Sequence, residues 1–214
     1  KQMEQFYQYL IYVHAGFGGI ALLAGLISIL AKKGHKVHKK SGMIFFFAML
    51  MSATLALVIC FLPGHQNVFL FLVGIFSSYF LLSGYRALRF KKHGPQKFDF
   101  IIQYMMLAAA LFMLLYPPII LHKISIVLSV FGAVGLVFSC REIYVLIKKK
   151  ETLKKDWLKK HLGNMMGAYI SSVTAFVVVN NLFEGVYNWF VPGLVGTIYI
   201  IYWTRKLTPK KKTA

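Results

Sequence analysis

The stretch Gly18–Gly42 reads GGIALLAGLISILAKKGHKVHKKSG, an apolar run that ends abruptly in a turn with several lysines. The same alternation continues along the chain, where seven apolar runs are separated by short gaps and positive charge fills every second gap. Of the 25 Lys and Arg residues, only Lys1 and Lys123 lie outside the first, third and fifth gaps and the C-terminal tail. Loops on the cytoplasmic side of membrane proteins carry such an excess of Lys and Arg. The pattern predicts an all-α polytopic membrane protein with its N-terminus outside and its C-terminus inside.

Seven transmembrane helices are predicted, because a helix needs about 20 apolar residues to cross the hydrocarbon core of a bilayer. The stretch 99–147 is too long for one crossing. Pro117–Pro118 supplies the break there, since proline removes a backbone donor and clashes with the preceding turn. We expect one membrane domain over residues 1–214, with spans near 7–31, 43–63, 67–90, 99–117, 119–147, 161–183 and 187–204.

Composition excludes an ordinary soluble core, because the chain is 58% hydrophobic and has only six acidic residues. A net charge of +19 could suggest a nucleic-acid partner, but the charge lies in short loops beside apolar runs. Membrane lipids with anionic headgroups on the cytoplasmic side are therefore the expected partners, and nucleic acid is not.

Two further expectations concern the cysteines and the N-terminus. Cys60 and Cys140 fall at opposite ends of their spans, so no disulfide is expected between them. The sequence opens at Lys1 without a methionine, and we expect a few N-terminal residues to be missing. The first apolar run lacks a small-residue cleavage site and is predicted to be a retained span.

His14 is the foremost candidate for chemistry inside the membrane. At 100° per residue it shares one helix face with Gly18, Ala21, Gly25 and Ser28, and small residues allow another helix to approach closely. His14 is therefore expected to point into the bundle. It could bind haem or a metal or handle a proton. The alternative is a neutral histidine that is hydrogen-bonded to a neighbouring helix.

The sixth apolar run is the most polar, and hydroxyl residues of the second and third runs lie at similar depth. Polar groups in the bilayer mark functional sites by default. Hydroxyls also commonly hold membrane helices together, which is the alternative for each of them. The residues predicted to contact a ligand are His14, Ser78, Tyr79, His161, Asn164, Tyr169, Ser172 and Asn180.

Histidines and arginines gather at the predicted cytoplasmic face. His35, His38, His93 and His161, with the carboxylate of Glu142, could form a zinc site. The lysines around the first two histidines disfavour a cation and favour a phosphate or a lipid headgroup. The predicted anion or headgroup ligands are His38, Arg86 and Arg141. Neither haem nor zinc is favoured as a cofactor.

Acidic residues are missing from the central half of every predicted span, which weighs against a proton- or sodium-coupled transporter. The sequence also lacks an HExxH motif and a nucleophile elbow. No catalytic residue is therefore predicted, and whether the protein is an enzyme stays open.

One resemblance covers most of the chain. His14, the glycine-rich Gly16–Gly19 and the basic turn Lys33–Gly42 resemble the domain-of-unknown-function (DUF) 2306 family of membrane proteins, with Lys39 where that group has arginine. His161–Phe176 is similar to the polar sixth helix of the group. The resemblance implies a bacterial multispan fold in the cytoplasmic (inner) membrane and no established activity.

A second resemblance joins the first two spans to transmembrane b-type cytochromes, which hold haem between histidines on facing helices. This chain departs from that pattern, because His14 has no histidine partner at its own depth. Only His65 and His122, at the outer ends of other spans, could pair with it.

These observations favour a protein that binds or transports a small molecule or lipid in a polar cavity between the first, second, third and sixth spans. His14 and Asn180 would recognise the ligand from the outer side, while His161, Asn164 and Tyr169 would shape the inner half. The alternatives are a b-type haem redox protein, a metal-dependent enzyme acting on lipids, and a structural subunit of a membrane complex. A homo-oligomer or a larger complex is compatible with each of them.

Overall fold

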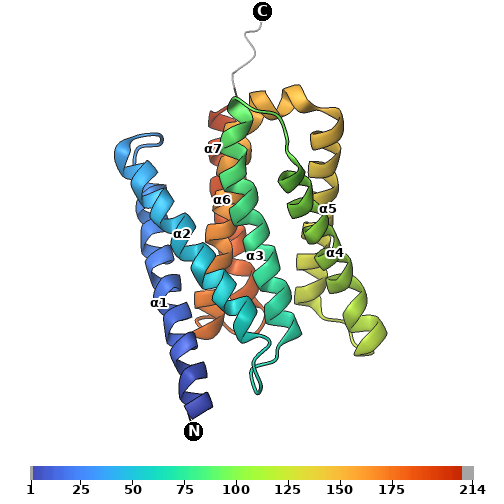
Figure 1. Cartoon of the computed structure of the whole chain (residues 1–214). Helices are drawn as coiled ribbons and strands as arrows, with labels where there is room; N and C mark the ends of the chain where they lie inside the picture. Colours follow the sequence, from blue (N-terminus) through green and yellow to red (C-terminus); the bar gives the residue numbers. More distant parts are fainter. Residues whose placement is uncertain (1, 209–214) are drawn as a thin grey trace, which may run out of the picture.

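The computed structural model describes residues 2–208, and this part of the chain is built from α-helices and one short 3-10 helix, without a strand. The helices run back and forth beside one another (Figure 1). Their bounds are α1 Gln2–Leu30, α2 Lys36–Ile59, α3 Val68–Ala87, η1 Leu88–Lys91, α4 Lys97–Ile120, α5 Ile126–Lys148, α6 Lys150–Val179 and α7 Tyr187–Lys206. The predicted all-α class is confirmed.

Two helical hairpins flank a central group of helices. In Figure 1 the α1–α2 hairpin lies on one side, α3, α6 and α7 lie in the middle, and the α4–α5 hairpin lies on the other side. Helix α2 crosses away from the central helices toward the end of the bundle where α7 finishes. Helix α1 begins at the opposite end, so the two ends of the described chain lie at opposite ends of the bundle.

Six of the helices in residues 2–208, α1 to α6, are long and apolar enough to cross a membrane. Helix α7 has 20 residues and is about 30 Å long at 1.5 Å per residue. It is not among the six, because Asn188, Pro192 and several tyrosines lower the hydropathy of its apolar stretch.

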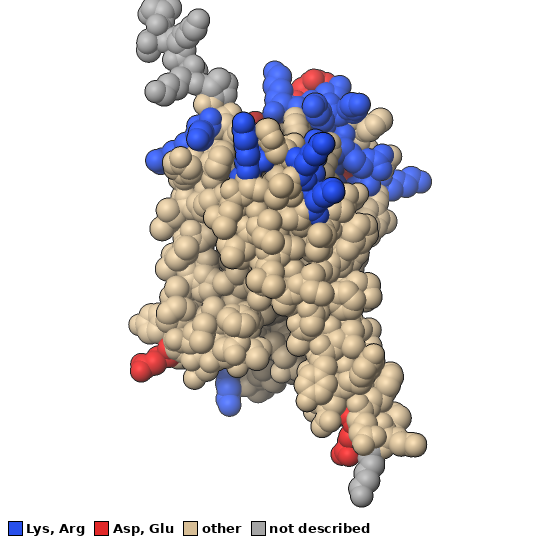
Figure 2. Space-filling view, turned by 90° about the vertical axis from the view of Figure 1, so that its left-hand side faces the viewer, with Lys and Arg blue, Asp and Glu red and all other residues tan. Residues whose placement is uncertain are grey.

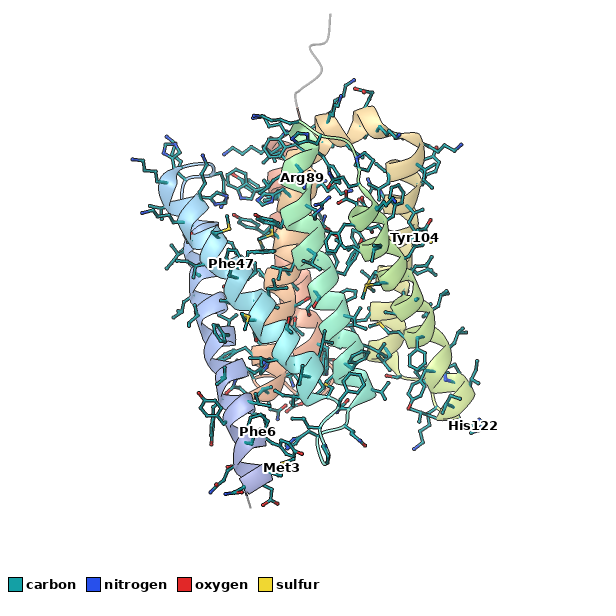
Figure 3. The ribbon with its side chains drawn as sticks, in the orientation of Figure 1. Met3, Phe6, Phe47, Arg89, Tyr104 and His122 are labelled. Carbon is teal, nitrogen blue, oxygen red and sulfur yellow. The ribbon has the colours of Figure 1, made fainter. Side chains whose placement is uncertain are left out.

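The surface divides into a charged end and a broad apolar band. Lysine and arginine gather at one end of the molecule, and the band below them carries almost no charge (Figure 2). Large apolar side chains point outward from this band, including Phe6, Phe47 and Tyr104, each more than half exposed (Figure 3). A soluble monomer rarely exposes so much apolar surface. These features are those of an integral membrane protein.

Small residues set the closest helix contacts. A methyl group on Gly84 of α3 would lie 2.9 Å from the backbone nitrogen of Met165 on α6. A methyl group on Gly167 of α6 would lie 2.7 Å from the ring of Phe80 on α3. The α3–α6 pair therefore packs with its backbones close together, as is common in membrane bundles.

The helix ends differ from the predicted spans in several respects, among them the start of α5 at Ile126 and not near 119. Helix α4 does not break at Pro117–Pro118 but continues to Ile120, so the break follows within one turn of the prolines. The amide of Leu121 still donates to the carbonyl of Pro117 at 3.2 Å. In addition, α2 and α6 begin within basic segments, at Lys36 and Lys150, since helical hydrogen bonding continues beyond the hydrocarbon edge.

Candidate functional site: a cavity at the basic end

A cavity of about 480 Å³ opens between the α1–α2 hairpin, the end of α3, and helices α6 and α7. This volume is in the range of pockets that enclose a drug-sized ligand, roughly 300–1,000 Å³. It lies at the end of the bundle that carries the lysines. Its walls are Gly25, Ser28, Ile29, Lys33, Gly34, His38, Lys39, Gly42, Met43, Phe45, Tyr85, Leu88, Trp157, Leu158, His161, Leu162, Met165, Met166, Tyr169, Tyr199, Trp203 and Leu207.

Most of this wall is apolar or aromatic, and the polar groups are few. They include two lysines and two histidines, and no acidic side chain lines the cavity within residues 2–208. Methionine and aromatic side chains adapt well to flexible apolar ligands. The cavity therefore has a largely apolar interior and positively charged side chains at its margin.

Helix α6 supplies His161 and Tyr169 to the cavity wall. The Nδ1 of His161 donates to the carbonyl oxygen of Gly84 on α3 at 2.9 Å. Because a carbonyl only accepts, this bond places the proton on Nδ1 and leaves the other ring nitrogen for a ligand. Tyr169 packs edge-on against Phe45, with ring centroids 6.0 Å apart, and its ring lies against Gly25 of α1.

His38 lies at the start of α2, beside the turn of the α1–α2 hairpin, and contacts α1. Its Nδ1 lies 2.9 Å from the carbonyl oxygen of Ser28 on α1, so this nitrogen donates the hydrogen bond. The hydroxyl of Ser28 donates in return to the carbonyl oxygen of His38 at 3.2 Å. These paired contacts fix the orientation of the imidazole at the cavity wall.

Lys33, in the turn between α1 and α2, connects the hairpin to α7. Its ammonium donates to the last carbonyls of α1, at Ser28 (3.3 Å) and Ile29, where the helix end is partially negative. The same nitrogen lies 5.9 Å from the ring centre of Tyr199 and 5.4 Å from that of Trp203, which are cation–π distances. The hydroxyl of Tyr199 also donates to the carbonyl of Ile29 at 3.4 Å.

The sequence reasoning did not single out Lys33, Lys39 or Tyr199 as site residues. The signal that could have found Lys33 is a lysine directly after the end of a span. The signal for Tyr199 is its spacing of four residues from Trp203, which puts both rings on one face of α7.

His14 lies outside the cavity and contacts α2 instead. Its Nδ1 lies 2.9 Å from the carbonyl oxygen of Ser52, and the Ser52 hydroxyl donates to the carbonyl of His14 at 3.1 Å. Of the predicted small-residue face, Ala21, Gly25 and Ser28 are buried, whereas His14 and Gly18 are only partly buried. The interhelical hydrogen bond that sequence analysis gave as the alternative role of His14 is present.

Replacing His14 with alanine is expected to lower the free energy of unfolding by about 1 kcal/mol, the usual net value of one such hydrogen bond. When expressed with added haem, the wild type and His14→Ala are expected to have the same absorption spectrum. Thermal unfolding in detergent and visible spectra of oxidised and dithionite-reduced samples measure the two effects. A Soret band that disappears in His14→Ala would contradict the structural role.

The other predicted polar residues mostly bond within their own helices. Ser78 donates to Gly74, Ser172 donates to Tyr169, and the exposed Asn180 donates to Phe176. Such bonds satisfy a hydroxyl or amide without a ligand. Two more predicted residues, Tyr79 and Asn164, are buried away from the cavity, and the Tyr79 hydroxyl has no hydrogen-bond partner within residues 2–208.

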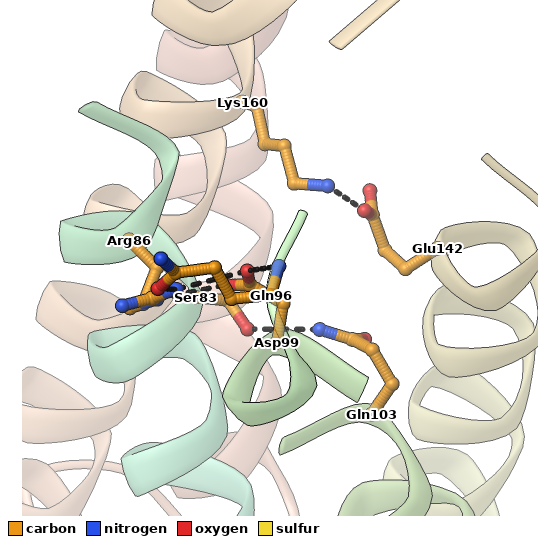
Figure 4. A network of polar contacts seen from close by, with 7 residues as sticks. All are labelled: Ser83, Arg86, Gln96, Asp99, Gln103, Glu142 and Lys160. Carbon is orange, nitrogen blue, oxygen red and sulfur yellow. Dashed lines mark hydrogen bonds and ion pairs between the residues drawn. The ribbon is translucent and has the colours of Figure 1, made fainter. Parts of the chain in front are cut away.

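Arg86 is engaged inside the protein. Its guanidinium forms a bidentate pair with Asp99, with Nε at 2.7 Å and Nη2 at 2.9 Å from the two carboxylate oxygens (Figure 4). Asp99 also accepts from the amide of Gln96 at 2.7 Å, which caps α4. Nearby, Gln103 donates to Ser83 at 3.3 Å. This network links α3 to the start of α4.

A second ion pair lies beside this network. Lys160 of α6 pairs with Glu142 of α5, and both side chains are largely buried (Figure 4). Arg141, the preceding residue, is exposed and does not line the cavity. Of the three predicted headgroup ligands, the structure therefore brings only His38 into the cavity.

Within residues 2–208, no three His, Cys, Asp or Glu side chains come close enough to share a metal ion. The five residues of the zinc hypothesis are therefore not brought together. Among the histidines of the haem hypothesis, His65 packs against Tyr7, with ring centres 6.0 Å apart. His122 lies at the tip of the α4–α5 hairpin, far from α1 (Figure 3).

Comparison with known proteins gives no further guide to the site: the chain matches no protein-family model, no curated protein and no solved structure. The resemblance to the DUF2306 family therefore stays a prediction. The function of the site is therefore inferred from its geometry.

Proposed function

We propose that this chain is an integral membrane protein that binds an amphiphilic small molecule or a lipid in the cavity at its basic end. The observation that carries the proposal is the cavity itself, about 480 Å³ of largely apolar space with a few polar side chains at one margin. Ligand sites typically have this composition, in which apolar walls supply affinity and a few polar groups fix orientation.

The position of the cavity fits such a ligand. Its deep part is bounded by Phe45, Met165 and Tyr169, and its margin by the lysine-bearing turn between α1 and α2. An amphiphile in a bilayer has the same arrangement, with its chain in hydrocarbon and its head at the interface. A ligand could therefore bind while it keeps its normal depth in the membrane.

The orientation in the membrane is part of the proposal. All seven helices would cross, with the basic end toward the cytoplasm as the positive-inside rule requires. The outward-facing apolar band and the charge at one end of the bundle support this arrangement. Location in a bacterial cytoplasmic membrane stays a prediction from the sequence resemblance.

Replacing Leu162 with tryptophan is expected to obstruct part of the cavity and to weaken amphiphile binding about tenfold or more, a loss of about 1.4 kcal/mol or more. The measurement is native mass spectrometry of the detergent-purified protein titrated with oleoyl lysophosphatidic acid. Leu194→Trp is the matched control, because Leu194 is exposed on the outer side of α7. Equal binding by wild type and Leu162→Trp would overturn the proposed function.

A further inference from the structure

The two lysines at the margin of the cavity differ from the two largely buried cations, Arg86 and Lys160. Arg86 and Lys160 are each paired with a buried carboxylate. Lys33 and Lys39 line the cavity, and no carboxylate pairs with either of them within residues 2–208. The protein therefore neutralises its interior cations and leaves the cavity margin positive.

Lys33 is held in place by contacts with α1 and α7. An ammonium group has three donors, and the carbonyls of Ser28 and Ile29 occupy two of them. The rings of Tyr199 and Trp203 flank the same nitrogen. A lysine that is fixed in this way needs little ordering when it binds an anion through its third N–H.

His38 and His161 add polar contacts next to these charges. Each uses Nδ1 to donate to a backbone carbonyl, Ser28 for His38 and Gly84 for His161. The second ring nitrogen of each is left for the polar part of a ligand.

We infer that the ligand is a single-chain amphiphile with an anionic head, whose head contacts Lys33, Lys39 and His38 and whose chain lies against Phe45, Met165 and Tyr169. This inference rests on the proposed function and specifies its ligand class. A single chain fits because a diacyl lipid is considerably larger than the drug-sized ligand that about 480 Å³ encloses. A phosphate monoester and a carboxylate share the required head chemistry.

The test uses the tryptophans that the protein already has. Trp157 and Trp203 line the cavity, whereas Trp189 packs against Phe69 away from it. Probes with brominated chains quench tryptophan on contact, and three heads are compared on the same chain: lysophosphatidic acid, a free carboxylate and zwitterionic lysophosphatidylcholine. The full-length protein in maltoside detergent is titrated with each probe, and the saturable part of the quenching gives the affinity.

The double variant Lys33→Gln, Lys39→Gln is expected to weaken binding of an anionic probe about tenfold or more, because charge-assisted hydrogen bonds are lost. Zwitterionic binding is expected to change less than about twofold. Lys148→Gln, Lys155→Gln is the matched control, since it removes the same charge from exposed positions outside the cavity. Lys33→Arg, Lys39→Arg keeps the charge and is expected to retain the preference for anionic heads.

The outcomes separate the inference from the proposed function. Equal affinity of the wild type for anionic and zwitterionic probes would overturn the anionic head while leaving the cavity as a binding site. An equal loss in the cavity variant and the control variant would also overturn it, because general surface charge would then explain the effect. Absence of saturable quenching by all three probes would overturn both. Loss of the anionic preference only in the glutamine variant of the cavity supports the inference.

Discussion

Replacing Asp99 with alanine is expected to lower the free energy of unfolding by about 3–5 kcal/mol, because it leaves a buried guanidinium without its counter-ion. The Asp99 side chain is 3% exposed and that of Arg86 is 13% exposed. The change also removes the acceptor for the Gln96 amide at the start of α4. Unfolding of the detergent-purified protein by heat or denaturant, followed by circular dichroism, measures the effect.

Two further variants make this prediction specific. Asp156→Ala removes an exposed carboxylate that pairs with Lys159, and we expect a loss of about 0.5 kcal/mol or less. The double variant Arg86→Leu, Asp99→Asn removes both charges and should recover part of the lost stability. If Asp99→Ala and Asp156→Ala were equally stable, the buried pair would not hold α3 and α4 together.

Replacing Gly84 with alanine is expected to destabilise the protein by about 1–3 kcal/mol through overpacking. The new methyl group would meet the backbone nitrogen of Met165 at 2.9 Å, and a backbone atom can move away only if α3 and α6 separate. Separation would also lengthen the hydrogen bond from His161 to the Gly84 carbonyl. Because His161 and Met165 line the cavity, amphiphile binding should weaken together with stability.

Gly163→Ala is the control for this change. Gly163 lies in α6, and a methyl group there would meet no atom within 4 Å. Alanine is a better helix former than glycine by about 1 kcal/mol, so this variant should be neutral or slightly stabilising. A Gly84→Ala protein as stable as Gly163→Ala would contradict the close α3–α6 contact. Unfolding curves and probe titrations on the same preparations provide both readouts.

The sequence predicted helix faces well because side-chain direction follows from periodicity alone. On the face that carries His14, the residues Ala21, Gly25 and Ser28 are buried and His14 contacts α2. Periodicity does not specify which helix covers a face, and Ser52 of α2 could not be identified as the partner of His14. It also does not specify helix ends in charged segments, which is why the early starts of α2 and α6 were missed.

The position of the cavity could not be predicted from the sequence. The sequence predicts a polar cavity between the first, second, third and sixth spans, with His14 and Asn180 recognising a ligand from the outer side. The observed cavity opens at the basic end beside Lys33, and neither His14 nor Asn180 lines it. The difference comes from how α2 crosses the bundle, which depends on packing along whole helices. His38, His161 and Tyr169 were predicted as site residues and do line the cavity.

The predicted role of Arg86 illustrates a second limit of prediction from sequence. Near a helix end, an arginine in a membrane protein is a natural ligand for lipid phosphate. Asp99 is close to Arg86 in space only because the segment between α3 and α4 folds back. Its carboxylate pairs with the guanidinium, which is then not free to bind a lipid phosphate. A pairing across a loop cannot be read from composition or helical spacing.

The contact between Tyr199 and Ile29 joins the last helix to the first, and this has a consequence for biosynthesis. The cavity takes part of its wall from the turn after α1 and part from α7, so a nascent chain that still lacks α7 has an open groove in place of a cavity. Helix α7 must therefore be synthesised and inserted before the proposed binding cavity is complete. Chains that end before α7 would insert into the bilayer without the proposed binding cavity.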